Sequence, residues 1–396
     1  YPCGDLELAA CRACGFVENI RFEPEVHEYS PRCEESQAFS PTFNRFALEL
    51  CDDYLRRHRP KTVLEIGCGK GDFLALICER GACAGIGIDP GLQPERVHDA
   101  AGGRIRWIVD FYGERYRDLA ADLVLCRHTL EHIQDVAAFV GTVHRGIPAG
   151  ASPAVAFELP DLERILVEGA FWDVYYEHCS YFTLGSLARL FRRAGFAVDR
   201  LAKCFGDQYL LIDAHVASAT PPLAPSHGED DLARTLAQVD AFRRSATQAV
   251  AAWRAYFADA KARREKVVLW GSGSMAVAFL TTLGLRDEVA CVTDVNPYRH
   301  GKFVPGAGHE IVPPGELRSV RPTRVVAMNP IYLDEIRAAL TGLGLAPELV
   351  ALGHASGPVC FPPPDNDDCA DAVPLTIDGA LFDTSGATTD GPVNDL

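Results

Sequence analysis

The sequence lacks any apolar run approaching the roughly 18–20 residues that a bilayer span needs, and it does not open with a charged stretch followed by an apolar one. It is also short of basic residues, because 38 Lys and Arg stand against 54 Asp and Glu, a formal charge of −16 over 396 residues. An acidic surface repels phosphate backbones. We therefore expect a cytoplasmic protein of roughly two to three domains, with neither a membrane nor a nucleic-acid partner.

A disulfide framework is not indicated either, since the 14 cysteines are scattered through a long chain in the manner of reduced thiols. One pair stands apart: Cys11 and Cys14 form a CxxC, whose spacing lets two thiolates face one metal. A structural zinc takes four ligands, and only Cys3 and Cys33 lie near the pair in sequence. Two interpretations stay open, an incomplete zinc site and a pair of ordinary thiols.

Both ends of the chain are unusual. The first residue is Tyr1 and not Met, so we expect the chain to begin inside a domain. From Ser356 onward the sequence has eight Asp and no Lys, Arg or Glu. The proline run in 361–365 is typical of a stiff linker. We expect residues 358–396 to be an acidic tail, either disordered or a truncated foreign domain.

Between the ends, two stretches alternate expected strands with expected helices. The first begins at Thr62 with an apolar strand, continues through a glycine loop to Gly71 and enters a helix near Phe73. A second strand ends at Asp89. Later strands are expected at 105–109, 123–126, 154–158, 197–201 and 209–215. This order predicts an α/β fold with a doubly wound sheet.

A long helix and a second such unit follow. Apolar residues recur at spacings of three and four between Asp230 and Arg264, which predicts one amphipathic helix. The strand 267–270 then runs into a second glycine loop, and the strand 289–293 ends at Asp294. With strands at 325–328 and 349–352, this region predicts a second Rossmann-like unit.

The first glycine loop has the chemistry of a nucleotide site. Gly67, Gly69 and Gly71 lack a Cβ, so a ligand can approach the backbone closely. Asp89, at the tip of the next strand, is placed to accept hydrogen bonds from two ribose hydroxyls. The loop reads GxGxG and lacks the usual third glycine of the dinucleotide fingerprint, and the strand before it carries an acid, Glu65.

This segment resembles the first motif of the class I S-adenosylmethionine-dependent methyltransferases. The resemblance implies that Gly67 and Gly69 pass beneath the methionine part of S-adenosylmethionine and that Asp89 binds its ribose. Asp110 and Phe111, after the third strand, match the position that contacts adenine. Glu65 joins the same set of cofactor-binding residues. A Rossmann domain for NAD or flavin is the alternative.

Polar side chains able to move protons gather in two further segments, 127–133 after the fourth strand and 174–182 after the fifth. The second places Tyr175, Glu177 and His178 within four positions, a set that is costly to bury in a core. We expect a site there. A structural or surface histidine is the alternative at each position.

The order of these parts resembles the three-domain nucleotide-sugar C-methyltransferases. Residues 175–178 match that family's Tyr-x-Glu-His motif, and 130–133 match the segment with its upstream histidine, here His132. Residues 294–306 are close to its Asp-x-Asn-Pro…Gly…Pro-Gly pattern, and Cys11-x-x-Cys14 resembles the second half of its zinc site. The resemblance covers about 8–357.

That family implies the domain plan and the chemistry. The parts are a partial zinc-binding domain (1–28), an S-adenosylmethionine-binding methyltransferase domain (29–220), a connecting helix (229–265), a C-terminal Rossmann-like domain that grips the nucleotide (266–357) and the tail (358–396). The small-molecule partner is a nucleotide-linked 4-keto sugar, methylated on the carbon next to the ketone through an enolate. By the resemblance, His178 is the base, Glu177 orients or assists it, and Tyr175 and His132 donate to the enolate oxygen.

Two departures from the family keep other functions open. The loop 205–209 replaces a glycine- and serine-rich loop, and its Asp207 is unfavourable beside a diphosphate. The segment 29–41 also differs from the family's version, although Tyr29 matches a lid tyrosine. The alternatives are an O- or N-methyltransferase acting on another polar metabolite, with His178 deprotonating a hydroxyl, and a binding module without turnover. The sequence does not fix the oligomeric state.

Overall fold

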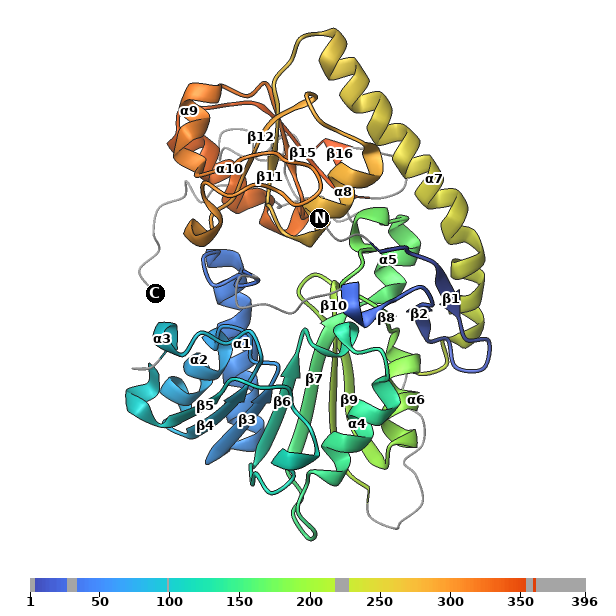
Figure 1. The fold of residues 1–396 in the computed structure, drawn as a ribbon, viewed down its shortest axis with the longest axis vertical. Coiled ribbons are helices and arrows are strands. Elements are labelled where there is room, and N and C mark those ends of the chain that lie inside the picture. Colours follow the sequence, from blue (N-terminus) through green and yellow to red (C-terminus); the bar gives the residue numbers. More distant parts are fainter. Residues whose placement is uncertain (1–3, 27–33, 98–99, 218–227, 354–358, 361–396) are drawn as a thin grey trace, which may run out of the picture.

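The fold consists of two sheet-based units joined by one long helix (Figure 1). The computed structural model describes residues 4–26, 34–97, 100–217, 228–353 and 359–360. Within these residues the strands form sheets of three, seven and six strands. The positions of Cys3, Tyr29 and Cys33 and the tail from residue 361 lie outside the described residues.

The largest sheet has the strand order β5-β4-β3-β6-β7-β10-β9. This sheet and its helices are here called the seven-stranded unit. Its strands are β3 (Thr62–Ile66), β4 (Ala84–Ile88), β5 (Ile105–Ile108), β6 (Leu123–Arg127), β7 (Ala154–Pro160), β9 (Phe196–Cys204) and β10 (Tyr209–Val216). The pairs from β5 to β7 are parallel, whereas β10 runs antiparallel to both of its neighbours. The order reverses between β3 and β6, and ligands of open α/β sheets bind at such a switch point.

Helices cover both faces of this sheet. They are α1 (Pro41–His58) and α2 (Asp72–Gly81) on one face and α4 (Val136–Arg145) and α6 (Leu184–Arg193) on the other. The unit also contains α3 (Pro94–Val97) and α5 (Leu162–Glu168). Alternate strand residues pack in two separate clusters, one with α1 and α2 and the other with α4 and α6. This two-sided burial explains the nearly continuous apolar strands of the sequence.

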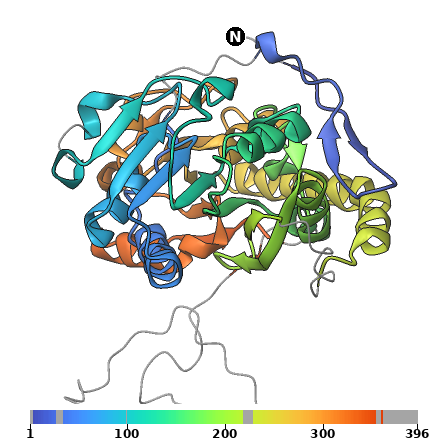
Figure 2. The same ribbon diagram turned by 90° about the horizontal axis from the view of Figure 1, so that it is seen from below.

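A three-stranded sheet attaches the N-terminal segment to this unit. Strands β1 (Leu8–Ala10) and β2 (Val17–Asn19) form a hairpin, and β2 pairs with β8 (Ser180–Tyr181). In Figures 1 and 2 the hairpin lies on the same side of the molecule as the long helix. Arg189 Nε donates to the Cys14 carbonyl at 3.0 Å, which fixes the hairpin turn to α6.

The long helix α7 (Leu232–Ala262) has 31 residues, about 46 Å at 1.5 Å per residue. It leads into the six-stranded unit, with β11 (Val267–Trp270), β12 (Val289–Thr293), β13 (Ile311–Val312), β14 (Arg324–Ala327), β15 (Glu348–Ala351) and β16 (Val359–Cys360). The order is β13-β12-β11-β14-β15-β16, parallel except for β16. Its helices are α8 (Ser274–Leu283), α9 (Leu317–Val320) and α10 (Leu333–Gly342).

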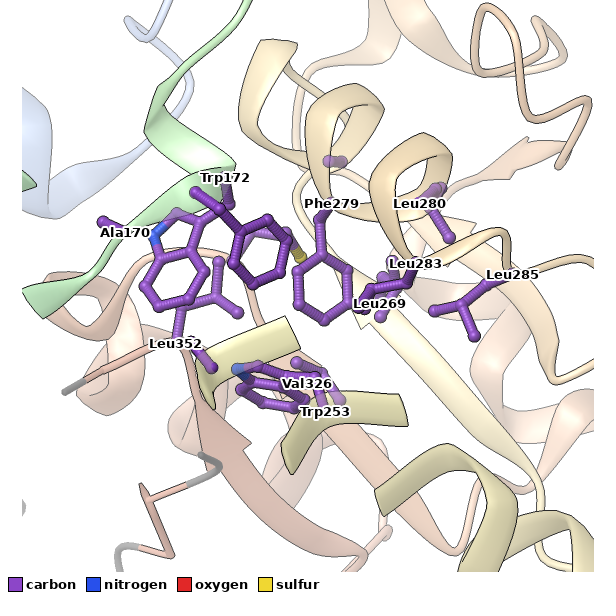
Figure 3. Packing of buried hydrophobic residues seen from close by; sticks show 14 of the residues in the cluster. Ala170, Trp172, Trp253, Leu269, Phe279, Leu280, Leu283, Leu285, Val326 and Leu352 are labelled. Carbon is purple, nitrogen blue, oxygen red and sulfur yellow. The ribbon is translucent and has the colours of Figure 1, made fainter. Parts of the chain in front are cut away.

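The two units share a hydrophobic core. Phe171 and Trp172, from a short helical turn of the seven-stranded unit, belong to one cluster with Phe279 of α8 and Trp253 of α7. Figure 3 shows Trp172, Phe279 and Trp253 in this cluster. The rings of Phe171 and Phe279 stack with centroids 5.8 Å apart. Trp172 is 1% exposed, so it belongs to this core. Burial of several aromatic rings at one junction holds the units in a fixed relation.

The predicted fold class is confirmed, including the second parallel sheet. The predicted helix 230–264 is α7, and the predicted strands correspond to β3–β7, β9–β12, β14 and β15. The domain boundaries stay a prediction. Within the described residues, no helix combines the length and apolarity that crossing a membrane requires.

Candidate active site

The loop between β3 and α2 takes a backbone that only glycine adopts readily. Gly67, Gly69 and Gly71 have φ angles of +70°, +54° and +85°. A Cβ on Gly67 would lie 2.0 Å from Thr129 Oγ1, and a Cβ on Gly69 would lie 3.0 Å from Glu35 Oε1. The glycines are therefore favoured by their positive φ angles and, at Gly67 and Gly69, by close neighbours from other segments.

Asp89 follows β4 and holds this loop. Its Oδ2 accepts from the Gly69 N–H at 2.9 Å, and its Oδ1 accepts from the Gly91 N–H at 2.6 Å. Burial raises the pKa of Asp89, against the opposing effect of these two N–H groups. Each carboxylate oxygen has two lone pairs, so each can still accept from a further donor such as a ribose hydroxyl.

Asp110 and Phe111 follow β5, the strand beside β4. Asp110 Oδ1 accepts from the Phe111 N–H at 2.8 Å and from Arg115 at 2.6 Å. The Tyr116 hydroxyl donates to Oδ2, which lowers the pKa of Asp110. The Phe111 ring is 62% exposed, so it offers an apolar face to a planar ligand at this end of the sheet.

Glu65 differs from the other predicted cofactor residues because it is 2% exposed. It shares a sheet face with Val63, which packs under α1 and α2. Burial raises the pKa of Glu65 to about 8, and the charge of Arg127 opposes that rise. Its Oε2 has no hydrogen-bond partner among the described residues. Its role in cofactor binding stays a prediction.

The predicted catalytic residues Tyr175, His178 and His132 lie together. The Tyr175 hydroxyl is 3.1 Å from His178 Nε2, and the two histidine rings meet edge to face with centroids 4.9 Å apart. Burial, followed by the charges of His132 and His128, lowers the pKa of His178 well below its ordinary value. Burial also raises the pKa of Tyr175 well above its ordinary value. At neutral pH, Tyr175 is therefore protonated and donates to a neutral His178.

His132 is fixed by its other ring nitrogen. Its Nδ1 lies 2.9 Å from the carbonyl oxygen of Glu177. A carbonyl only accepts, so Nδ1 carries the proton, and Nε2 of the neutral ring is an acceptor. This contact joins the short turn after β6 to the segment that carries His178.

Glu131 is a member of this site that sequence reasoning did not assign. A carboxylate oxygen of Glu131 and ring nitrogens of His132 and His178 all lie within 4.8 Å of one another. Glu131 is 2% exposed, and among the described residues neither of its oxygens accepts a hydrogen bond of normal geometry. The available signal was its place beside His132, which does not distinguish a buried acid from a surface one.

A buried network of charged residues lies next to Glu131. Arg127 donates to both oxygens of Glu158, at 2.8 and 3.2 Å, and His128 Nε2 lies 3.0 Å from the same carboxylate. His128 Nδ1 is 3.4 Å from Glu131. Burial disfavours a charged His128, but the carboxylates of Glu131 and Glu158 outweigh it and raise the pKa of His128 to about 9. His128 is therefore a cation at neutral pH.

The Glu177 carboxylate contacts the six-stranded unit. The Ser274 hydroxyl donates to Glu177 Oε2 at 3.1 Å. Ser274 begins α8, directly after the second glycine loop. The loop that carries Asp207 also contacts this unit, because the adjacent Gln208 hydrogen-bonds Asn329. Glu177 and His178, which the resemblance predicts to act together, thus have different neighbours. His178 contacts Tyr175, whereas Glu177 contacts Ser274 of the six-stranded unit.

Cys11 and Cys14 lie in the hairpin turn between β1 and β2. Hydrogen bonding, first from the Ala13 backbone and then from the Cys14 side chain, lowers the pKa of Cys11. Among the described residues, no third potential metal ligand joins the pair. Two thiols supply half of a tetrahedral zinc set, so zinc stays a prediction.

Two family models match the two units of this chain. Residues 36–201 match a family described as a methyltransferase domain, and residues 226–344 match one described as a C-methyltransferase C-terminal domain. The C-methyltransferase NovU of Streptomyces niveus is 27% identical over 360 residues, which cover 84% of this chain and 81% of NovU. These matches show an S-adenosylmethionine-dependent methyltransferase whose C-terminal part is similar to that of C-methyltransferases.

Other methyltransferases are similar over shorter stretches. The ubiquinone biosynthesis O-methyltransferase of Pseudomonas paraeruginosa is 32% identical over 101 residues, 23% of this chain and 41% of that enzyme. The solved 1,6-didemethyltoxoflavin-N1-methyltransferase of Burkholderia thailandensis, bound to S-adenosylhomocysteine, is 19% identical with a TM-score of 0.35. That match covers 46% of this chain and 80% of the other.

The residues of this methyltransferase fit S-adenosylmethionine. The lone pairs left on Asp89 suit two ribose hydroxyls, and the exposed Phe111 ring suits a purine. The Glu35 carboxylate lies close to the Gly69 backbone, since a Cβ on Gly69 would stand 3.0 Å from Glu35 Oε1. The buried Asp89 carboxylate and the exposed Phe111 ring thus lie where a nucleoside would bind.

Proposed function

We propose that this C-methyltransferase acts on a nucleotide-linked 4-keto sugar, at the carbon next to the ketone, with His178 as the base. The observation that carries the proposal is the 3.1 Å hydrogen bond from Ser274 to Glu177. It joins the start of α8, beside the second glycine loop, to the residue immediately before His178. A substrate that reaches both places must have two parts.

The second glycine loop is suited to the nucleotide part. Ser272 donates to Asp294 Oδ2 from its N–H at 2.8 Å and from its hydroxyl at 2.6 Å. This repeats the strand, glycine loop and acid of the first unit, an arrangement that binds nucleotides at the carboxyl ends of parallel strands. Arg299, 3.2 Å from Asp294, brings a positive charge to the same place. The sugar would then extend toward His178.

Methylation of a carbon next to a ketone requires an enolate. S-adenosylmethionine, when bound, supplies the electrophilic methyl group. His178 takes the C–H proton at Nε2, which the hydrogen bond from Tyr175 marks as the unprotonated nitrogen. The Tyr175 hydroxyl must leave Nε2 for this transfer, and it can then donate to the developing enolate oxygen.

His132 and Glu131 have distinct tasks in this scheme. Because His132 Nδ1 donates to a backbone carbonyl, its Nε2 can donate to the enolate only when the ring carries a second proton. Proton transfer also leaves an imidazolium at His178 in a buried site. The Glu131 carboxylate, within 4.8 Å of both rings, is the charge that offsets either cation.

The test combines variants with a panel of 4-keto nucleotide sugars and cofactor carrying a labelled methyl group. We expect His178→Asn to lower transfer to carbon by about 10²–10⁴-fold, and Glu131→Gln to lower it less, with S-adenosylhomocysteine binding unchanged. His215→Asn is the control, since His215 is partly exposed and paired with Asp199. Unchanged transfer by His178→Asn contradicts the assigned base.

The product of the same assay distinguishes the other functions. Label on oxygen or nitrogen would indicate methylation of another polar metabolite. Binding of nucleotide sugars without any transfer would indicate a binding module. We also propose that Cys11 and Cys14 bind zinc. Metal analysis of the unsubstituted protein and of the double variant Cys11→Ser, Cys14→Ser tests this, and Cys291→Ser, at a buried position, is the control.

A further inference from the structure

The segment 34–40, here called the strap, lies between the first glycine loop and the six-stranded unit. On the six-stranded side, Asn296 Nδ2 lies within hydrogen-bond distance of Glu34 Oε1 (3.1 Å) and the Ser36 carbonyl (3.2 Å), and Arg299 Nε donates to the Glu34 carbonyl at 3.1 Å. On the other side, Ser36 Oγ donates to Asp72, the first residue of α2, at 2.6 Å. Both neighbours of Glu35 are therefore fixed.

Glu35 points from the strap at the glycine loop. Its Oε1 is 3.0 Å from the position that a Gly69 Cβ would take, and its Oε2 is 3.7 Å from Lys70 Nζ. Its side chain is 39% exposed, so solvent reaches part of it. By the class I resemblance, the methionine part of the cofactor passes over this loop.

The charge around Glu35 is suited to another cation. The carboxylates of Asp89 and Glu34 act on it unfavourably, and Lys70 acts on it favourably. Lys70 Nζ is itself engaged by the Gly91 carbonyl at 2.8 Å. Burial raises the pKa of Glu35 to about 7, the behaviour of a carboxylate that lacks sufficient positive charge.

We propose that Glu35 binds the ammonium group at the methionine end of S-adenosylmethionine and that the strap positions it there. The cofactor carries one ammonium, close to the glycine loop by the resemblance, and a carboxylate beside Gly69 is the complementary partner. The inference rests on cofactor binding, which the family establishes, and not on the proposed sugar. Its test therefore needs no sugar.

The experiment compares two ligands by calorimetry. S-adenosylhomocysteine has the amino-acid arm, whereas 5′-methylthioadenosine keeps the adenosine and the thioether but lacks that arm. For Glu35→Gln we expect S-adenosylhomocysteine to bind about tenfold or more weakly, and 5′-methylthioadenosine to bind as it does to the unsubstituted protein. Glu49→Gln, on an exposed position of α1, is the matched control and should change neither affinity.

A pH series supplies a second readout. The unsubstituted protein should bind S-adenosylhomocysteine more weakly as the pH falls below about 7, because protonation removes the Glu35 charge. Glu35→Gln should not show this dependence. The inference is overturned if Glu35→Gln leaves both affinities unchanged, or if it weakens both ligands equally, since the arm would then not be the group that Glu35 contacts.

Discussion

Gln208 and Asn329 hydrogen-bond each other in both directions. Gln208 Nε2 donates to Asn329 Oδ1 at 3.0 Å, and Asn329 Nδ2 donates to Gln208 Oε1 at 2.7 Å. Gln208 lies in the β9–β10 loop, and Asn329 follows β14 in the six-stranded unit. Because amides are uncharged, the pair joins the units without the desolvation cost of a buried ion pair.

A double-mutant cycle should measure this pairing. We expect Gln208→Ala and Asn329→Ala each to destabilise the protein, with a coupling of about 1 kcal/mol between them in urea unfolding. Asn329 Oδ1 also accepts from the Ile331 N–H, so its single effect should exceed that of Gln208. Strictly additive effects contradict a direct interaction.

The glycine loop can be tested with a matched pair of glycines. Gly67 and Gly344 have nearly the same φ, +70° and +72°, but a Cβ on Gly67 meets Thr129 at 2.0 Å whereas one on Gly344 meets nothing within 4 Å. Gly344→Ala should cost about 1 kcal/mol of stability, from the backbone alone. Gly67→Ala should cost more and weaken S-adenosylhomocysteine binding, and adding Thr129→Ala should recover part of the difference.

The pKa of His128 predicts a pH dependence of stability. It rises from about 6.5 in the unfolded chain to about 9 in the folded protein. The contribution, on the order of 3 kcal/mol at 1.36 kcal/mol per pKa unit, is therefore complete below pH 6.5 and is lost as the pH rises through 9. His128→Asn should destabilise the protein at pH 6 and have much less effect near pH 9.5, in urea unfolding.

Asparagine is the appropriate replacement because His128 has a φ of +48°, which Asn tolerates better than most residues. A His128→Asn destabilisation that is equal at pH 6 and pH 9.5 would mean that His128 is not charged in the folded protein.

The fold was accessible from the sequence because its signals are local. A strand, a glycine loop and a helix follow each other within 62–81, and again within 267–283. The three-and-four spacing of α7 likewise depends only on neighbouring turns. Ends were less accurate: the predicted strand 197–201 is β9, Phe196–Cys204, because its hairpin partner extends the pairing to Cys204.

The site was less accessible because its contacts join distant segments. The sequence predicted that Tyr175, His178 and His132 share a site. It did not predict the hydrogen bond between Glu177 and Ser274. The role of Glu131 follows from its burial in the fold, and that of Glu35 from the position of the strap beside Gly69. Such roles depend on which chain segment packs nearby, and a single sequence carries no record of that.

The pairing of β2 with β8 connects the β1–β2 hairpin to the segment that carries His178, the proposed general base. The Asn19 N–H donates to the carbonyl of Cys179, the residue after His178, at 2.9 Å. The backbone beyond His178 is thus held by a segment from the N-terminal end of the described chain. Undocking of the β1–β2 hairpin should therefore speed amide hydrogen exchange in β8. A thiol-directed reagent at Cys11 or Cys14 that undocks the hairpin should then lower activity without binding in the active site.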